Sequence, residues 1–437
     1  MRNKNRKKPK ERIAIITGLR TPMARADGVF AKIQADQLGS ILLRELMMRT
    51  PVDVSEVDEV IIGNVAQPIH AANIARVIAL RAGFPESISA LTVHRNCASG
   101  MESITTSASR IHAGDGRIYV CGGVESMSNI PLVYNEKMTK LFTKLGRSKT
   151  FIDRLRTLLG FRPGYLKPIV GLMSGLTDPV SGLLMGSTAE VLAQDFGISR
   201  EEQDMFALKS HEKAQRAKEC GRFALESMAV IYDEYEGKYL NYDDGIREVL
   251  TLEKLAQLKP FFDKRNGTVT AGNSSQITDA AAGVVLMSES EAKKRGLQPL
   301  GYLHDYAYAG LDPKRMGLGP VYSTHKLFKQ TGFNMKNIEI IEINEAFAVQ
   351  VLACERAFSS KAFAKEHFGE TRAVGAIDTD ILNVNGGAVA LGHPVGMTGT
   401  RLVITVLHEL RKRGLQRGLA TLCIGGGQGA SLLLEVE

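Results

Sequence analysis

The chain has 437 residues, a formal net charge of +8 and a hydrophobic content of 44%. This length can bury a large core and fits two or three domains or one large duplicated unit. No apolar run approaches the roughly 20 residues of a membrane-spanning helix, and the first residues, MRNKNRKKPKER, lack the apolar stretch of a secretory signal. We therefore expect a cytoplasmic protein.

The positive charge is concentrated in two segments, the N-terminal tail and residues 137–167. Such patches suit phosphate-bearing small ligands, an anionic membrane face or an acidic partner, because this attraction does not depend on sequence. Nucleic acid is not expected as a partner, since no basic segment combines with aromatic residues in a recognisable binding module. The five cysteines lack the close spacing of a zinc or redox site, so we expect them to be reduced and to bind no metal.

The apolar pattern alternates short strands with amphipathic helices, which is typical of a sheet covered by helices and predicts an α/β fold. In the first half it predicts strands at residues 12–19, 57–65, 90–96 and 117–122, and helices at residues 36–49, 73–83 and 99–113. The run at residues 281–287 could supply a last strand.

The same order returns in the second half. It predicts strands at residues 300–308, 338–344, 381–385, 419–424 and 431–436, and helices at residues 325–332, 345–358 and 397–414. Corresponding strands end in or carry similar residues: Asn64 and Asn344, Asn96 and Asn385, and Cys121 and Cys423. We infer two related halves packed together, with a site where their strand ends meet.

These patterns divide the chain into three units. Residues 1–128, completed by 261–295, form the first half of the core, and residues 296–437 form the second half. Residues 129–260 are predicted to be an inserted loop domain or lid. It contains the basic and apolar stretch 137–167, a glycine-rich piece, and a charged helix from about Arg200 to Cys220 with Ser199 as its N-cap.

Three glycine-flanked motifs carry candidate chemistry: NCASG with Cys97, GHPVGMTG with His393, and CIGGGQG with Cys423. Cys97 precedes a predicted helix, where backbone N–H groups and the helix dipole favour a thiolate, so it is the candidate nucleophile. Cys121, Cys220 and Cys354 are interpreted as small core residues. His94 and His325 are interpreted as structural or surface residues, and Gly425–Gly427 as a tight turn rather than a phosphate loop.

Taken together, NCASG, NEAFA (from Asn344), NVNGGAVALGHPVGMTG and CIGGGQG resemble the four active-site motifs of the thiolases, in their usual order. The resemblance covers nearly the whole chain. It implies a duplicated five-layer α-β-α-β-α thiolase fold with an inserted loop domain, and a homodimer or a dimer of dimers. It implies no cofactor, because CoA and acyl-CoA are substrates.

The resemblance also implies residue roles. Cys97 would become acylated, His393 would be its base, and Cys423 would pass protons to and from the departing or attacking group. Asn344 would hold a water that forms an oxyanion hole with His393, and the backbone amides of Cys97 and Gly425 would form a second hole. Such electrostatic stabilisation is often the largest catalytic contribution, on the order of 3 kcal/mol for each donor.

The substrate-binding positions follow from the same resemblance. Ser275 and Ala271 would meet the pantetheine arm of CoA, Met316 and Phe347 would line the acyl pocket, and Met185 is a further substrate-binding candidate. Many short-chain members carry a histidine before that methionine, and this chain has Leu184. The difference argues against an enzyme dedicated to acetoacetyl-CoA.

The expected function is cleavage of 3-ketoacyl-CoA in fatty-acid β-oxidation. A biosynthetic acetyl-CoA C-acetyltransferase is the first alternative, and a ketoacyl synthase-type condensing enzyme or a non-catalytic lipid-binding relative is a remote one. Condensing enzymes use two histidines with their cysteine and would not need Cys423, and a non-catalytic relative would have lost a motif. The chain departs from the thiolases of oxidation complexes at one position, because these usually have histidine in place of Asn344.

The basic segment 137–167 resembles the insertion in thiolase subunits of fatty-acid oxidation complexes. Its apolar residues are too many for a free surface, and its only acidic residue is Asp153. It is therefore expected to bind either an anionic membrane face or a hydratase/dehydrogenase subunit, with a solvated lid as the plain alternative.

Overall fold

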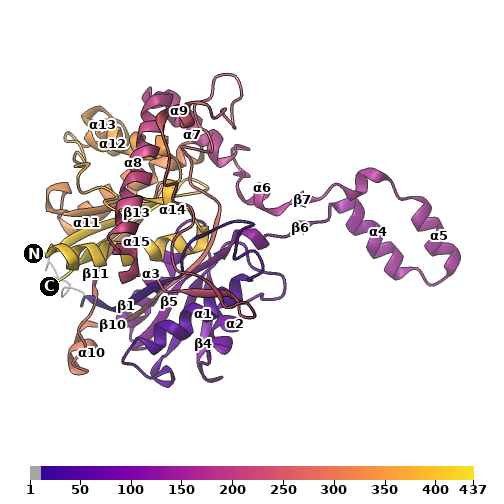
Figure 1. Cartoon of the computed structure of the whole chain (residues 1–437), viewed down its shortest axis with the longest axis horizontal. Coiled ribbons are helices and arrows are strands. Elements are labelled where there is room, and N and C mark those ends of the chain that lie inside the picture. Colours follow the sequence, from indigo (N-terminus) through magenta and orange to yellow (C-terminus); the bar gives the residue numbers. More distant parts are fainter. Residues whose placement is uncertain (1–10) are drawn as a thin grey trace, which may run out of the picture.

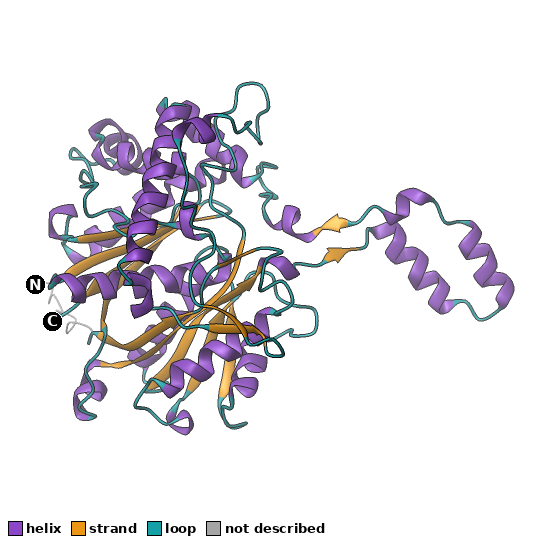
Figure 2. Ribbon diagram, viewed as in Figure 1, coloured by secondary structure: helices purple, strands orange, loops and turns teal. Residues whose placement is uncertain are grey.

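In a computed structural model of the protein, residues 11–437 can be described, so most of the basic N-terminal tail lies outside the described residues. The body is built of five layers, with helices between and outside two sheet halves (Figures 1 and 2). A long arm projects from one side of this body (Figure 1).

The first sheet half has the strand order β4-β3-β5-β10-β1. Its strands are β1 (Ile13–Arg20), β3 (Glu59–Gly63), β4 (Ser89–Val93), β5 (Ile118–Ser126) and β10 (Thr278–Ser288), and the short β2 (Ala24–Arg25) pairs with β10. β3 runs parallel to both neighbours, whereas β10 runs antiparallel to both β5 and β1.

The second half repeats this arrangement with the order β12-β13-β14-β11. Its strands are β11 (Gly301–Gly310), β12 (Ile340–Ile343), β13 (Arg417–Ile424) and β14 (Gln428–Glu435). β12 is parallel to β13, and β14 is antiparallel to β13 and β11. β1 and β11 pair with each other, so the halves join into one continuous sheet.

The prediction of a strand at residues 381–385 is wrong. The segment still lies beside β12. Only an isolated parallel bridge joins Leu382 to Ile341 of β12. Asn383 has a positive φ of 43°, and its side chain takes over the pairing. Its amide accepts from the Ile343 N–H at 2.9 Å and donates to the Ile343 carbonyl at 2.9 Å. The side-chain amide of Asn383 thus makes the two hydrogen bonds to Ile343 that a strand would make through its backbone.

The outer helices cover the two sheet halves. α1 (Ala35–Met48) and α2 (Ile74–Ala82) pack on the first half, and α11 (Gly319–Thr331) and α12 (Ala348–Ser359) on the second. α11 begins six residues before the predicted start, with Pro320 in its first turn, where a missing N–H does no harm. The remaining small helices of the body are α10 (Glu289–Lys294), α13 (Lys361–Phe368) and α14 (Ala388–Leu391).

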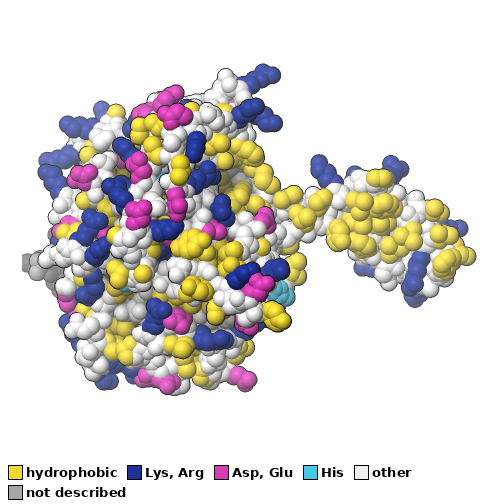
Figure 3. All heavy atoms as spheres, viewed as in Figure 1, with side chains coloured by type: hydrophobic (Ala, Val, Ile, Leu, Met, Phe, Trp, Pro, Cys, Tyr) yellow, Lys and Arg dark blue, Asp and Glu magenta, His cyan; other side chains and the backbone are white. Residues whose placement is uncertain are grey.

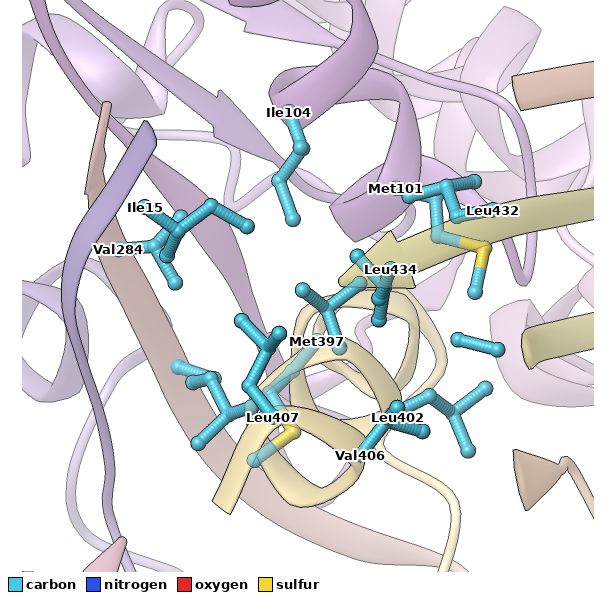
Figure 4. Packing of buried hydrophobic residues seen from close by; sticks show 14 of the residues in the cluster. Ile15, Met101, Ile104, Val284, Met397, Leu402, Val406, Leu407, Leu432 and Leu434 are labelled. Atoms are coloured by element: carbon cyan, nitrogen blue, oxygen red, sulfur yellow. The ribbon is translucent and has the colours of Figure 1, made fainter. Parts of the chain in front are cut away.

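The central layer consists of α3 (Ser99–Ala113) and α15 (Val395–Arg413). Alternate strand residues face it, as Ile13 and Ile15 of β1 do, while Ala14 and Ile16 face the outer helices. Figure 4 shows the apolar contacts of this layer, made by Met101, Ile104, Met397, Leu402, Val406, Leu407, Ile15, Val284, Leu432 and Leu434.

The two central helices approach each other through glycines in their first turns. A Cβ on Gly100 would lie 2.8 Å from the Thr400 nitrogen, and one on Gly399 would lie 2.6 Å from the Met101 nitrogen. A Cβ on Gly123 of β5 would collide with the Gly396 carbonyl. The starts of α3, α15 and the end of β5 therefore meet at distances that only glycine allows.

The inserted segment contains both packed and projecting parts. α7 (Met185–Phe196), α8 (Arg200–Glu219) and α9 (Leu252–Ala256) lie on the body, and so does the hairpin of β8 (Val230–Asp233) and β9 (Lys238–Leu240). The predicted N-cap of α8 is confirmed: the Ser199 hydroxyl accepts from the Glu202 N–H, and Glu202 reaches back to the Ser199 N–H.

The projecting part, which we call the arm, comprises residues 132–170. The short strands β6 (Leu132–Val133) and β7 (Ile169–Val170) pair to form its base, and α4 (Glu136–Arg147) and α5 (Phe151–Leu159) form its tip. Beyond β7, α6 (Gly171–Gly175) returns the chain to the body. Within residues 11–437, no helix is both long and apolar enough to cross a membrane.

A buried network of charges ties the inserted segment to both halves. Arg20 of β1 pairs with Glu226 at 2.8 Å and with Asp243 at 2.7 Å. Arg222 pairs with Glu226 at 3.0 Å and also with Glu409 of α15. Their side chains are at most 1% exposed. Burial acts to raise the pKa of Glu226, but Arg222 and Arg20 outweigh it and lower the pKa to about 2.

We predict that Glu226→Gln lowers the free energy of unfolding by about 3–5 kcal/mol, because it leaves two buried guanidinium groups with one partner fewer. Urea unfolding at neutral pH measures the change. Since the native pKa is depressed, the contribution is present above the ordinary pKa of 4.5 and is lost as the pH falls toward 2. Glu248→Gln, which breaks an exposed pair with Lys218, is the control and should change little. Equal effects of both substitutions would contradict the network's role.

Candidate active site

Most of the predicted site residues line one cavity of about 610 Å³ between the two halves and the inserted segment. Its walls include Cys97, Met185, Ser275, Met316, Phe347, His393, Cys423 and Gly425. Asn344 and Ala271 are the two predicted site residues that do not line it. Asn344 is fully buried next to His393, and Ala271 is exposed on the surface.

Cys97 lies in the turn between β4 and α3, just before the first turn of the helix. Asn96 adopts a positive φ of 44°, and its side chain donates to the Gly425 carbonyl at 2.7 Å. This bond ties the turn that carries Cys97 to the turn that follows Cys423. Asn96 and Asn385 are each flanked by an isolated bridge, between Arg95 and Cys97 and between Val384 and Gly386, but only Asn96 of the two has a positive φ.

The Cys97 thiol is neutral at ordinary pH. Burial raises its pKa, hydrogen bonds from the backbone of Gly425 and of Cys97 itself lower it, and the charge of Glu125 raises it. The two backbone amides that interact with this sulfur are the pair expected to form an oxyanion hole. Both amides therefore lie beside the Cys97 sulfur, where backbone donors favour the thiolate form.

His393 lies between α14 and α15, and its orientation is fixed from three sides. Its backbone N–H donates to the Gln276 carbonyl at 3.0 Å. Its Nδ1 lies 2.6 Å from the Thr398 hydroxyl, which donates to the Pro394 carbonyl at 2.9 Å. Because a hydroxyl has one proton to donate, Thr398 accepts from Nδ1–H, which assigns the proton to Nδ1 and leaves Nε2 as a base.

Asn344 lies on the Nε2 side of this imidazole. Its Nδ2 is 3.4 Å from His393 Nε2, consistent with an unprotonated Nε2 that accepts. Burial, followed by the charge of Arg401, lowers the pKa of His393 to about 3. The histidine is therefore neutral in the free protein, as the thiol is.

Cys423 lies at the end of β13, followed by a turn in which Gly426 and Gly427 have φ values of 88° and 80°. A Cβ on Gly427 would collide with the Leu311 carbonyl, so this turn requires glycine, as the sequence predicted. Burial raises the pKa of Cys423 well above its usual value, and the neighbouring Cys97 and Cys354 raise it further. The site thus holds two protonated thiols and a neutral imidazole.

The substrate-binding candidates lie on two segments that are joined to each other. The Ser275 N–H donates to the Ala346 carbonyl at 3.0 Å, and the Ala348 N–H donates to the Asn273 carbonyl at 2.9 Å. A bridge between Ser274 and Phe347 continues this pairing and keeps residues 345–347 out of the helix predicted there. Ser275 and Phe347 are therefore held at the cavity wall together.

Several lining residues were missed by sequence reasoning. His94, which was interpreted as structural or surface, is exposed but lines the cavity, and Glu125 and Asp178 contribute carboxyl groups to it. The inserted segment adds an apolar wall of Ile130, Leu172, Leu176 and Val180. Only the glycines before Glu125 gave a sequence signal for any of these. Cys121 and Cys354 are buried as predicted, whereas Cys220 is exposed, contrary to its interpretation as a core residue.

Two domain families match the chain. Residues 13–290 match the thiolase N-terminal domain, and residues 297–436 match the thiolase C-terminal domain. A 3-ketoacyl-CoA thiolase of Shewanella halifaxensis is 40% identical over 428 residues, which cover 98% of this chain and 97% of the relative. One of Pectobacterium atrosepticum is 39% identical over 427 residues, with the same coverage of 98% and 97%.

Solved structures agree with these sequence relatives. The crystal structure of Bacillus anthracis acetyl-CoA acetyltransferase superposes with a TM-score of 0.85 at 37% identity, covering 98% of this chain and 100% of that one. Human mitochondrial 3-ketoacyl-CoA thiolase in complex with CoA superposes with a TM-score of 0.84 at 34% identity, covering 98% and 99%. The expected thiolase fold is thus confirmed. Since both domains match and relatives align over nearly the whole length, the chain belongs to the thiolase family of acyltransferases.

Proposed function

We propose that this thiolase cleaves 3-ketoacyl-CoA with CoA, giving acetyl-CoA and an acyl-CoA shortened by two carbons, in fatty-acid β-oxidation. The observation that carries the proposal is that two thiols and a neutral imidazole face one largely apolar cavity. The names of the relatives from Shewanella and Pectobacterium support the same reaction.

In the proposed first step, the Cys97 sulfur attacks the ketone carbon while its proton moves to His393 Nε2. A free thiolate–imidazolium pair is unfavourable here, because burial raises the pKa of Cys97 and lowers that of His393. The proton therefore moves as the carbon–sulfur bond forms. The amides of Cys97 and Gly425 stabilise the resulting oxyanion.

The carbon–carbon bond then breaks and leaves an acyl group on Cys97. The electron pair of the broken bond leaves with the acetyl unit, which becomes an enolate. Asn344, through a bound water, and His393 stabilise that enolate, and Cys423 protonates its carbon. After acetyl-CoA departs, the Cys423 thiolate takes the proton of an incoming CoA thiol. This thiol attacks the acyl group, and Cys97 regains its proton from His393. The scheme needs no metal or cofactor, and Ser275, which lines the cavity, meets the pantetheine arm.

The covalent step gives a direct test of the two thiols. Incubation with a short acyl-CoA, followed by peptide mass mapping, should place the acyl group on the peptide with Cys97. Cys423→Ala should still be acylated but should lose turnover by roughly 100- to 10,000-fold, because it loses a proton-transfer group. Cys97→Ala should not be acylated. An adduct on Cys423 with Cys97 unlabelled would reverse the roles.

The substrate class is tested by steady-state cleavage of 3-ketoacyl-CoAs of increasing length. The apolar wall from the inserted segment and Leu184 in place of a histidine favour chains longer than acetoacetyl. Each buried methylene contributes about 0.8 kcal/mol, so two more should raise kcat/KM at least about 10-fold. Cys97→Ala serves as the inactive control. The highest kcat/KM with acetoacetyl-CoA would instead favour the acetyl-CoA C-acetyltransferase, the activity named for the Bacillus anthracis neighbour.

We further propose that the protein is a cytoplasmic homo-oligomer, a dimer or a dimer of dimers. Among the described residues β4 ends the strand order of the first sheet half, and this supports self-association, because the edge of a sheet can pair with a strand of a second molecule. β4 leads directly into the turn that carries Cys97, so a contact there would lie next to the site.

The arm is proposed to bind an anionic membrane surface. Figure 3 shows apolar side chains gathered over its tip, with lysines and arginines around them. One short helix, α5, carries a cluster of uncovered apolar side chains that are 47–78% exposed: Phe151, Ile152, Leu155, Leu158 and Leu159. Residues 137–167 carry one acidic side chain, Asp153, among many basic ones. An apolar face flanked by lysine and arginine is typical of helices that lie on an anionic membrane. We therefore favour a lipid surface over a partner protein as the binding target of the arm.

Cosedimentation with anionic and neutral vesicles tests the arm. The intact protein should bind anionic vesicles at low salt and less at high salt, since each lysine or arginine contributes about 1 kcal/mol and salt screens it. Changing Lys140, Lys144, Arg154 and Arg156 to Glu should abolish binding. The matched control changes four exposed lysines of the body, Lys32, Lys264, Lys294 and Lys336, to Glu. Equal loss in both variants, or retention only by a hydratase/dehydrogenase subunit in a pull-down, would refute membrane binding.

A further inference from the structure

Glu125 is a buried carboxyl group in the active-site cavity for which the proposed reaction assigns no role. It lies near the end of β5, is 1% exposed, and lines the same cavity as Cys97, His393 and Cys423. A charge is expensive to bury unless it is hydrogen-bonded, so its position requires an explanation.

Four N–H groups donate to this carboxylate, two to each oxygen. Oε1 accepts from Ala66 N at 3.0 Å and from Asn64 Nδ2 at 3.1 Å. Oε2 accepts from Val65 N at 3.1 Å and from Gly396 N at 2.9 Å. Gly396 is in the first turn of α15, where backbone N–H groups have no partner within the helix. A carboxylate there also interacts favourably with the helix dipole.

These bonds join three pieces of chain: the loop after β3, the end of β5 and the start of α15. A Cβ on Gly396 would lie 2.7 Å from Glu125 Oε2 and 2.8 Å from the Val124 carbonyl, so the contact is tight. His393 precedes Gly396 by three residues, and its Nδ1 is bound to Thr398 in the same first turn. Whatever sets the position of this turn therefore sets the position of the imidazole.

We propose that Glu125 is a positioning residue for the thiolase reaction: its carboxyl group anchors the first turn of α15 to the ends of β3 and β5, and so holds His393 at the cavity that Cys97 lines. The inference rests on the proposed function for its catalytic consequence. Above its pKa of about 7, Glu125 also places a negative charge close to the nucleophile.

Burial and hydrogen bonding act on the pKa of this carboxyl group in opposite directions. Burial raises the pKa of Glu125 to about 7, while the N–H donors of Ala66, Val65, Gly396 and Asn64 act to lower it. The charge of Glu125 in turn raises the pKa of the Cys97 thiol. The other titratable groups that line the cavity are His94, Asp178, His393 and Cys423.

Glu125→Gln separates positioning from a purely structural role. The glutamine keeps the shape but turns an NH2 group toward two of the four donors, and it removes the charge. We expect kcat to fall about 10- to 100-fold with little change in KM, because a shift of the imidazole by a fraction of an ångström impairs proton transfer. We also expect the pH profile of Cys97 alkylation by iodoacetamide, followed by peptide mass mapping, to move to lower pH.

Two further variants complete the test. Glu125→Asp keeps the charge but shortens the reach, so kcat should fall while the alkylation profile stays near that of the unmodified protein. Asp58→Asn is the matched control, because Asp58 accepts from Arg117 N at 2.6 Å and Ile118 N at 2.8 Å at the opposite ends of β3 and β5. It should lower the Tm without changing kcat or the alkylation profile.

The proposal is overturned if Glu125→Gln retains the original kcat and alkylation profile, or if the kcat losses merely follow Tm and are equal in Asp58→Asn. If Glu125→Gln gives no cooperative unfolding transition, Glu125→Asp decides: a lower kcat at the original KM supports positioning, and an unchanged kcat refutes it. Failure of the unmodified protein to cleave any 3-ketoacyl-CoA would refute the proposed function instead, and the alkylation profiles would still test the effect of Glu125 on Cys97.

Discussion

The close contact between the first turns of α3 and α15 is the constraint on which the site depends. Each helix begins just after a residue of the site, Cys97 for α3 and His393 for α15. Gly100 and Gly399 lie at the contact, where any Cβ would meet backbone of the other helix. Because two halves of the sheet clamp this layer from both sides, the glycine contact fixes the thiol and the imidazole at one cavity.

Burial determines the protonation states of the two thiols and the imidazole in the cavity. It keeps the thiols of Cys97 and Cys423 protonated and His393 unprotonated, so no member of the set is ionised before substrate arrives. Reactivity then depends on donors already in place, such as the Gly425 amide, and on the tautomer that Thr398 selects. A preorganised site of this kind needs little rearrangement as charge develops.

The inserted segment links the cavity to the surface of the molecule. Leu172 and Leu176 line the cavity, and β7, which ends just before them, is one strand of the arm's base. The same short stretch of chain therefore forms part of the apolar wall of the cavity and leads out to the arm (Figure 1). Elsewhere the segment is locked to the body by Arg222 and Glu226, whose buried pairs reach both β1 and α15.

The sequence by itself determined the alternation of strands and helices, the duplication and the four motifs, because these are properties of local periodicity and of short runs. Helix α3 has the bounds that the pattern predicts, and Ser199 caps α8 as expected. The prediction of a strand at residues 381–385 was wrong because the Asn383 side chain, which apolar periodicity does not reveal, makes the hydrogen bonds to β12 there. Helix α12 begins at Ala348, later than the predicted start at residue 345, because Phe347 pairs with Ser274, a residue distant in the sequence.

Only the tertiary structure decided which polar groups share the cavity. Glu125 and Asp178 lie in segments with no catalytic motif, and His94 lies just before the NCASG motif without being part of it. Their places follow from how β5, β4 and the inserted segment converge. Ala271 was predicted beside Ser275 from a shared motif, yet it is exposed while Ser275 lines the cavity, because the loop turns between them. The sequence determines which residues share a short segment. Burial, the crossing of helices and hydrogen bonds between distant segments determine which of those residues face the cavity.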